Sequence, residues 1–480
     1  MKALCFNRLD LVAECVVLFA LGTTAAKAQS KSMQVWDPPA ITVFPDHNKV
    51  ARSPDLLPSM VKDGELLFKA KFNILDGAGR PASTGDSKPT PRPRRDGDLF
   101  TRISGPDSNS CAGCHYQPKV GGSGEFVANV FVGAHFKDPP ALSIAQEITN
   151  ERNTISLFGS GSIELLAREM TRDLRTQREE GQRKAVAALK DVEIHLITKG
   201  VDFGRIFARP DGSYDETHLD GVDPDLVVKP FGVKGIAVSL REFSIAALNQ
   251  HHGMQAIERF GWQRTGRQDF DEDGVAVEFT IGQLSALVLF QASLPAPSRL
   301  LPGAPFDTEV QRRGEQLFNK IGCATCHIPS LKLQANSFSE PNPYNRPGTI
   351  TLSDVEGPID LLLPAGGSGN GVQVNSDGTF SVFAFSDLKR HRICDSQEPF
   401  FCNERLRQDN VPTDEFLTAK LWDLATSAPY GHRGDCGTVS EVIIHHGGEA
   451  AQSRRQFQAL FNEEKRALIA FLLSLGAGSY

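Results

Sequence analysis

Four cysteines and two histidines form the same short pattern at two places in the sequence. Cys111-Ala112-Gly113-Cys114-His115 and Cys323-Ala324-Thr325-Cys326-His327 both read C-x-x-C-H. Two thiols at this spacing can each add to one vinyl group of a haem, and the adjacent histidine can then bind the iron from the proximal side. The sequence therefore predicts two covalently bound c-type haems, with His115 and His327 as the proximal iron ligands.

Thioredoxin-like redox pairs and halves of zinc sites also contain two cysteines at this spacing. A redox pair does not need a histidine directly after the second cysteine in both copies, and no strand-helix-strand pattern supports such a fold. A zinc site would have to join two pairs that lie in different halves of the chain. Haem attachment is the interpretation that uses all six residues.

The sixth ligand of each iron decides between electron transfer and chemistry, because a weak or missing ligand lets the iron bind peroxide or oxygen. No methionine follows the second motif, so this part of the chain offers only histidine nitrogens. We prefer His446, because the two glycines after it allow close approach of the backbone to a macrocycle. An ordinary surface or hydrogen-bonded histidine remains the alternative. The other candidates are His391, His432 and His445.

The first motif has its nearest candidate for a sixth ligand in His135. More distant candidates are His195, His218, His251 and His252.

A third candidate site is the acidic segment Asp269-Phe270-Asp271-Glu272-Asp273-Gly274, which has the alternating carboxylates and the glycine of a calcium loop. Asp269, Asp271 and Asp273 would be ligands of a calcium ion. Thr280 stands where an EF-hand has its bidentate glutamate, although Glu278 lies close by. A solvated acidic turn is the alternative.

Helices must position these motifs. Apolar residues from Val310 to Ile321 recur at helical spacing and lead directly into the second motif. A closing helix begins near Asn462, which can cap it, and stops at Gly476. Residues 63–68 begin a similar helix before the first motif, and Ser162 to about Thr198 is typical of one or two charged amphipathic helices.

These elements predict a mainly α fold in which two c-type cytochrome domains pack together, with long loops and few short strands. We expect an N-terminal haem domain at 29–300 and a C-terminal c-type cytochrome domain at 301–480, after a proline-rich join.

Residues 1–28 are typical of a signal peptide, with Lys2 and Arg8 before an apolar run and Ala26-Lys27-Ala28 as the cleavage site. We expect cleavage after Ala28 and a periplasmic protein, with a frayed N-terminus as the alternative. The 58 Asp and Glu residues outnumber the 51 Lys and Arg residues, which disfavours nucleic-acid binding through a basic surface. No apolar run is long enough for stable membrane insertion.

Three further cysteines, Cys394, Cys402 and Cys436, are an odd number for an oxidising compartment. We predict one disulfide, from Cys394 to Cys402, which leaves Cys436 free.

The sequence resembles the bacterial di-haem cytochrome c peroxidases, and more closely their branch of di-haem oxidoreductases sometimes labelled thiol oxidoreductases. The resemblance spans most of the mature chain. Besides the two haem motifs, it rests on Gly105-Pro106-Asp107-Ser108, residues 126–132, Leu157-Phe158-Gly159-Ser160-Gly161, residues 385–391, residues 428–434 and His446-Gly447-Gly448-Glu449-Ala450.

The resemblance implies that the N-terminal haem binds the substrate and that the C-terminal haem receives electrons. It places His446 at the sixth ligand of the C-terminal haem, His135 near a displaceable histidine, and Glu164 near a distal acid-base group. A carboxylate that only stabilises a helix N-terminus is the simpler account of Glu164. The implied partners are a small periplasmic electron donor, a cytochrome or cupredoxin, and a small-molecule oxidant.

The sequence departs from this family at three points. The peroxidases carry a tryptophan between the haems, whereas this region has Phe158 and no tryptophan. Residues 392–394 and 431–434 also differ from the usual pattern of the branch. Peroxide reduction is the preferred function. A non-enzymatic di-haem electron carrier is the alternative, as are an oxygenase or a protein-modifying enzyme on the same scaffold.

Overall fold

The structure, a computed structural model, describes residues 37–79, 108–125, 127–131, 149–271, 273–299, 308–367 and 370–476. Within it, Pro39–Tyr480 form one compact unit. The predicted signal peptide at 1–28 and the candidate ligand His135 lie outside the described residues.

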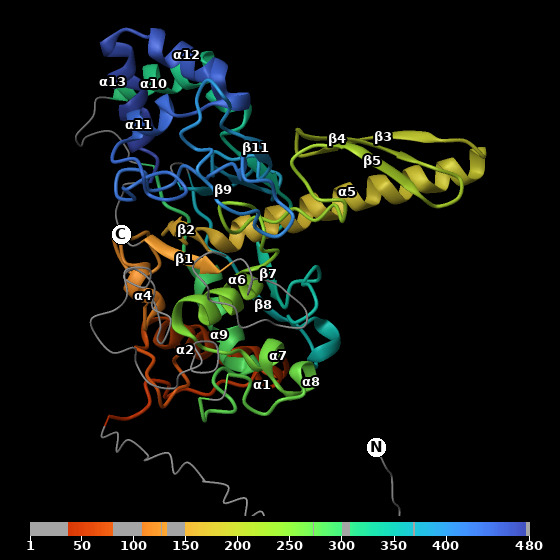
Figure 1. Cartoon of the computed structure of the whole chain (residues 1–480), viewed down its shortest axis with the longest axis vertical. Coiled ribbons are helices and arrows are strands. Elements are labelled where there is room, and N and C mark those ends of the chain that lie inside the picture. The colour runs from red at the N-terminus through yellow and green to blue at the C-terminus, as the bar shows by residue number, and fades with distance from the viewer. Residues whose placement is uncertain are drawn as a thin grey trace, which may run out of the picture. The chain divides into compact units, whose positions relative to one another are not determined.

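The first motif follows a helix that packs closely against a second helix. α2 (Leu57–Lys69) lies against α9 (Ile281–Ser293), as Figure 1 shows. Gly64 makes this approach possible, because a Cβ atom at this position would lie 1.9 Å from the carbonyl oxygen of Ala286. Two backbones can come this close only where one residue lacks a side chain.

The second motif repeats this arrangement. α10 (Thr308–Lys320) packs against α13 (Asn462–Leu473), and a Cβ atom at Gly314 would lie 2.1 Å from the carbonyl oxygen of Ala467. Both α2 and α10 contain the sequence Gly-Glu-x-Leu-Phe. The helix predicted before the second motif is therefore confirmed. Asn462 begins α13 instead of capping it, and the Glu464 carboxylate accepts a hydrogen bond from the Phe461 amide at 3.0 Å.

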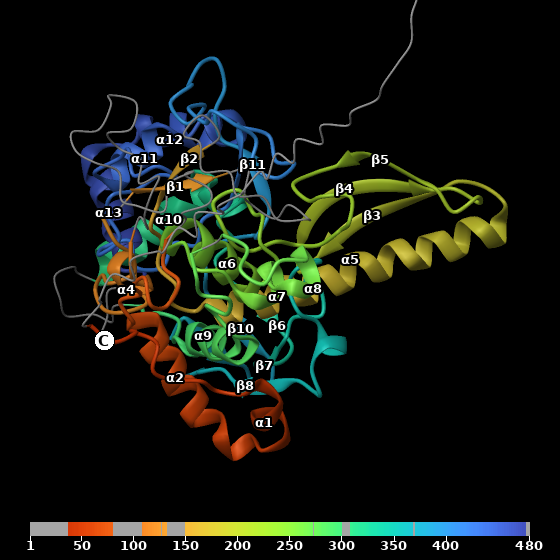
Figure 2. The ribbon, with the colours of Figure 1, turned by 60° about the horizontal axis from the view of Figure 1, so that its bottom comes forward.

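A long helix and a small sheet follow the first motif. α5 (Ser160–Ala188) lies along the antiparallel sheet of β3 (Val192–Thr198), β4 (Val201–Ala208) and β5 (Tyr214–Leu219), and both views show them side by side (Figure 2). The prediction of helix up to Thr198 is wrong for its last residues. Ile194, Leu196 and Thr198 are buried and alternate with exposed residues, which is the two-residue period of a strand.

Four more small antiparallel sheets occur in the described part of the chain. They are β1 (Val127–Phe131) with β2 (Thr149–Asn153), β6 (Leu331–Leu333) with β10 (Phe380–Val382) and β9 (Val372–Val374), β7 (Ser337–Glu340) with β8 (Ile359–Leu362), and β11 (Arg390–Arg392) with β12 (Glu415–Leu417). The fold is therefore mixed α/β, and the predicted mainly α class is wrong. Most of these strands have three to five residues, too few for a clear alternation of polar and apolar residues.

Short helices complete the fold. They are α1 (His47–Arg52), η1 (Pro54–Leu56), α4 (Cys111–Cys114), α6 (Leu240–Ala247), η5 (Leu248–His252), α7 (Ile257–Phe260), α8 (Trp262–Thr265), η6 (Cys323–Thr325), η7 (Leu352–Asp354), α11 (Val439–Ile444), η8 (Gly448–Ala450) and α12 (Ala451–Ala459). Among the described residues, we find no helix whose length and apolar character would suit a membrane span.

Two clusters of buried apolar side chains form most of the interior. The larger one joins residues of α2, α5 and α9 to Leu333, Phe338 and Trp422. The smaller one surrounds Phe318 and Phe471, between α10 and α13. Residues from both sides of position 300 thus share the larger cluster, and the division into domains at 29–300 and 301–480 stays a prediction.

Candidate haem-binding sites

The first motif forms α4, and His115 follows directly at its end. Nδ1 of His115 donates a hydrogen bond to the carbonyl oxygen of Gly122 at 3.1 Å. Burial lowers the pKa of His115 to about 4, so the ring is neutral and its Nε2 carries the lone pair. A neutral imidazole whose other nitrogen donates to the backbone is the arrangement that histidine ligands of metals adopt.

The second motif has the same geometry. Nδ1 of His327 donates to the carbonyl oxygen of Phe385 at 2.9 Å, and burial lowers the pKa of His327 to about 4. Each ring also faces the phenylalanine of its preceding helix: Phe68 lies 6.2 Å from His115 and Phe318 lies 6.5 Å from His327, between ring centroids. Two separate stretches of the chain thus hold their proximal histidines in the same way.

The cysteines of the motifs suit covalent attachment to a haem. Burial raises the pKa of both Cys111 and Cys323 to about 12, so both thiols are neutral. Thioether bonds to a haem carry no charge and suit these surroundings. Cysteines and histidines of both motifs therefore fit haem.

His446 lies in electrostatic range of His327. Its charge contributes, after burial, to the lowered pKa of His327, and its own Nδ1 donates to the carbonyl oxygen of Val442 at 2.7 Å. His446 therefore presents Nε2 as a metal-binding atom. The glycines after it pack on protein: a Cβ atom at Gly448 would lie 2.3 Å from the Arg392 carbonyl oxygen. The role of His446 as a sixth ligand stays a prediction.

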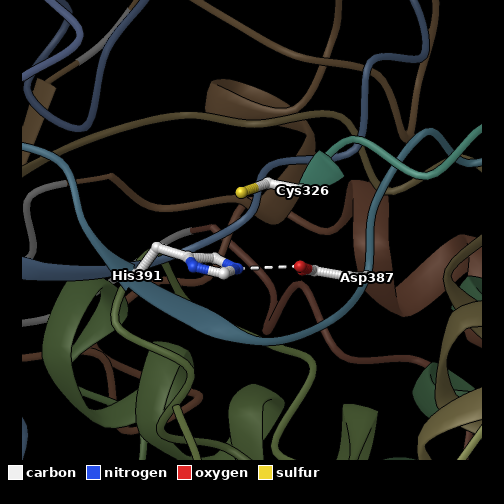
Figure 3. Close-up of side chains that lie close together, drawn as sticks. All are labelled: Cys326, Asp387 and His391. Atoms are coloured by element: carbon white, nitrogen blue, oxygen red, sulfur yellow. Dashed lines mark hydrogen bonds and ion pairs between the residues drawn. The ribbon is translucent and has the colours of Figure 1, made fainter. Parts of the chain in front are cut away.

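The other three histidines predicted for this site have partners of their own. His445 stacks on Phe400 with 3.6 Å between ring centroids, and His432 hydrogen-bonds Asn403 at 2.7 Å. His391 lies beside Cys326 and Asp387 (Figure 3).

The cluster of Cys326, Asp387 and His391 has donor atoms close enough to hold a metal ion. However, both ring nitrogens of His391 bond to carboxylates, Nε2 to Asp387 and Nδ1 to Glu449, each at 2.7 Å. Burial opposes a charged ring, but the hydrogen bonds to Asp387 and Cys326, and the charges of these two groups, raise the pKa of His391 to about 11. A ring protonated on both nitrogens has no lone pair for a metal, so the cluster fits a charged group that supports the second motif.

Two histidines of η5 lie next to the first motif. Nδ1 of His252 donates to the carbonyl oxygen of Ser108 at 2.6 Å, and its Nε2 lies 3.6 Å from Sγ of Cys111. His251 contributes, after burial, to the lowered pKa of His115. Both histidines are far from the first motif in sequence, so the sequence alone predicts them only as more distant candidates for its sixth ligand. By contrast, His195 and His218 lie on the sheet beside α5.

Glu164, the predicted acid-base group, lies in the first turns of α5 and is fully buried. Its Oε1 accepts hydrogen bonds from Arg168 and from Asn342, and its Oε2 accepts one from the Leu240 amide at 2.7 Å. These contacts account for both oxygens. The catalytic role of Glu164 stays a prediction, and the contacts favour the simpler account of a structural carboxylate.

The segment Lys420–Asp423 connects the surroundings of the two motifs. Nζ of Lys420 donates to the carbonyl oxygen of Phe158 at 3.2 Å, and the charge of Lys420 acts on the pKa of His115. The Leu421 amide donates to the carbonyl oxygen of Ala384, next to Phe385, whose own carbonyl holds His327. Trp422 is 4% exposed and packs on Gly159. A buried tryptophan thus lies beside Gly159, the neighbour of Phe158 in sequence, but it comes from a distant part of the chain.

The predicted disulfide between Cys394 and Cys402 is confirmed, and Cys436 is a buried free cysteine. If haem occupies the other four cysteines, denatured mature protein should show one reactive thiol before reduction and three after it. Titration with a thiol reagent in denaturant, with and without a reductant, measures both numbers. Three thiols before reduction would contradict the disulfide, and five or more would contradict haem attachment.

Comparison with known proteins places these sites in context. No family model matches the chain. Two curated relatives are both named cytochrome-c peroxidase IdrP2: one from Pseudomonas sp. (strain SCT) is 27% identical over 277 residues, and one from Denitromonas iodatirespirans is 24% identical over 260 residues. Each match covers 54% of this chain and 62% of the relative, so the chain spans less than two thirds of the curated relatives' length.

Two solved structures show weaker likenesses. Kuenenia stuttgartiensis hydrazine synthase, pressurised with 20 bar xenon, is 14% identical with a TM-score of 0.38, over 90% of this chain and 96% of that chain. A MauG-like protein associated with microbial copper homeostasis is 17% identical with a TM-score of 0.26, over 56% and 80%. These TM-scores are too low to support a conclusion. The curated matches support the predicted resemblance to cytochrome c peroxidases over about half of the chain: this part of the chain is distantly similar to two proteins of that name.

Proposed function

We propose that this protein is an exported di-haem oxidoreductase that reduces hydrogen peroxide, with two electrons and two protons, to two molecules of water. The observation that carries the proposal is the shared geometry of His115 and His327, each neutral and each fixed through Nδ1 to a backbone carbonyl. When bound, the haems would supply redox centres that store electrons, and one iron would offer a site for peroxide.

The chain's own residues would hold the two centres differently. At the second motif, His446, which the Val442 carbonyl orients, would hold the haem together with His327, and a haem held by two histidines would suit electron entry. At the first motif, His251 or His135 would be the second, displaceable histidine, and its release would admit peroxide. Cys111, Cys114, Cys323 and Cys326 would anchor the haems.

Electrons would pass between the motifs along Lys420–Asp423. The hydrogen bonds of Lys420 to Phe158 and of Leu421 to Ala384 join the backbone near His115 to the backbone near His327. The buried ring of Trp422 lies in the same segment.

Low-temperature EPR of the holoprotein tests whether an iron opens for substrate. We expect a high-spin ferric signal in the oxidised or the half-reduced protein, because a weak sixth ligand leaves the iron high-spin. The half-reduced protein should then reduce peroxide with a reduced small cytochrome as donor. If both haems stay low-spin in either state and do not respond to peroxide or cyanide, the protein is an electron carrier. A second histidine bound at each haem would produce this result.

A pair of variants tests which histidine is the sixth ligand of the haem at the first motif. His251→Ala should create or increase the high-spin signal of one haem, while His218→Ala on β5 should leave the spectrum unchanged. An unchanged spectrum in His251→Ala would exclude His251 and leave His135 as the candidate.

The partners and the location follow from this function. A small periplasmic cytochrome or cupredoxin would reload the second centre, and the oxidant would be a small molecule. Cleavage after Ala28 would release the protein into the periplasm.

A further inference from the structure

The acidic loop 269–273 contains a buried carboxylate without a partner. Oxygen atoms of Asp269, Asp271 and Asp273 all lie within 4.8 Å of one another. Asp271 is 0% exposed, and neither of its carboxylate oxygens has a hydrogen-bond partner. An unpaired buried carboxylate is among the costliest groups that a protein can contain, unless a cation compensates it.

The other two aspartates are held by the loop's own backbone. Oδ2 of Asp269 accepts a hydrogen bond from the Gly274 amide at 2.8 Å, and Oδ1 of Asp273 accepts one from the Val275 amide at 2.7 Å. These bonds fix the positions of both carboxylates beside Asp271. The loop therefore brings the three side chains together without neutralising them.

Glu278 adds a fourth carboxylate to the group. It is 6% exposed, and its Oε2 accepts a hydrogen bond from the Gln255 amide at 2.6 Å. Its carboxylate lies close enough to those of Asp271 and Asp273 to interact with them electrostatically. Four carboxylates gathered in this way repel one another, and a cation between them would remove this repulsion.

We propose that Asp269, Asp271, Asp273 and Glu278 bind one calcium ion. Calcium accepts six to eight oxygen ligands in flexible geometry, whereas magnesium demands a near-ideal octahedron and keeps several waters. Four carboxylates on a loop therefore suit calcium. Glu278 would serve as the last ligand of the loop, in place of the glutamate of an EF-hand. Thr280 is not available for this role, because it caps α9, where its Oγ accepts a hydrogen bond from the Gln283 amide at 3.2 Å.

A bound ion would stabilise the side chains that pack next to the first motif. Phe279, the neighbour of Glu278, packs on Phe72 with 6.2 Å between ring centroids, and Phe72 packs on His252 at 5.4 Å. His252 in turn contacts Cys111. The calcium site thus supports the residues around the first motif from outside, and it does not depend on the proposed peroxidase function.

Thermal unfolding of the chelator-treated holoprotein, with and without about 1 mM Ca²⁺, tests the proposal. Calcium should raise the Tm, because it binds the folded state alone, whereas the same concentration of Mg²⁺ should raise it far less. Calorimetric titration should show one calcium ion bound per chain.

Two variants make the test specific. Asp271→Asn should abolish the gain with calcium, because it removes the buried carboxylate that would bind the ion. Asp211→Asn, in the exposed turn before β5, should keep the full gain. An equal calcium effect in Asp271→Asn and wild type would overturn the site, as would no calcium effect in the wild type.

Discussion

Replacement of both Cys323 and Cys326 by alanine should leave a protein that carries one haem instead of two. The second motif would then have no thiol for a thioether, and His327 alone would hold a haem only reversibly. The first motif uses separate residues on α4, so its haem should remain. The haem content per chain, from the pyridine haemochrome spectrum, and the mass of the denatured polypeptide measure this result.

The matched control is Cys436→Ala, which removes a buried cysteine that belongs to neither motif. This variant should keep two haems and the wild-type mass minus one sulfur atom. Peroxide reduction should fall to the background rate in the double variant alone, because that variant loses the proposed electron entry. Two covalent haems in the double variant would contradict the assignment of the second motif.

The haem motifs could be predicted because their chemistry is local. Five consecutive residues contain both thiols and the histidine, and no tertiary contact is needed to recognise them. The helix of Val310 to Ile321 could be predicted for a similar reason, since its apolar face repeats over three turns. The Cys394–Cys402 disulfide joins residues that are also close in sequence.

The missed features depend on contacts between distant residues. His252 reaches Cys111 only because η5 and α4 meet in the fold. Trp422 packs on Gly159 across a large separation in sequence, so the absence of a tryptophan from the sequence around Phe158 does not predict this contact. A repeat that the sequence does contain, Gly-Glu-x-Leu-Phe in α2 and α10, could have shown that the two motifs share one framework.

The fold class was wrong because short strands carry little signal. Val192–Thr198 follows a long amphipathic helix, and its charged residues continue that pattern closely enough to hide the alternation. β6, β9, β10, β11 and β12 have three residues each, and their hydrogen bonds to neighbouring strands define them.

A buried group of charges joins α6 to α7 and β7. Arg241 is 0% exposed, and its Nε donates to both oxygens of Glu258 at 3.0 Å. Its Nη1 donates to Glu340 at 2.6 Å and to Ser285 at 2.9 Å. α6 continues into η5, which carries His251 and His252, so this group fixes the helix that faces the first motif.

Arg241→Met should lower the free energy of unfolding by about 3–5 kcal/mol, because Glu258 and Glu340 would be left as buried charges without their partner. The loss should depend on pH. Burial already raises the pKa of Glu340 to about 7 against the opposing effect of Arg241, and without Arg241 it would rise further. A glutamate with a raised folded-state pKa stabilises the protein while it is protonated and loses this contribution as pH rises. Denaturant unfolding should therefore show a larger loss at about pH 8 than at about pH 5.

Arg52→Met, which breaks the exposed pair with Glu356, should cost less than about 1 kcal/mol at either pH. Equal losses in the two variants would show that the buried group does not stabilise the fold in this way.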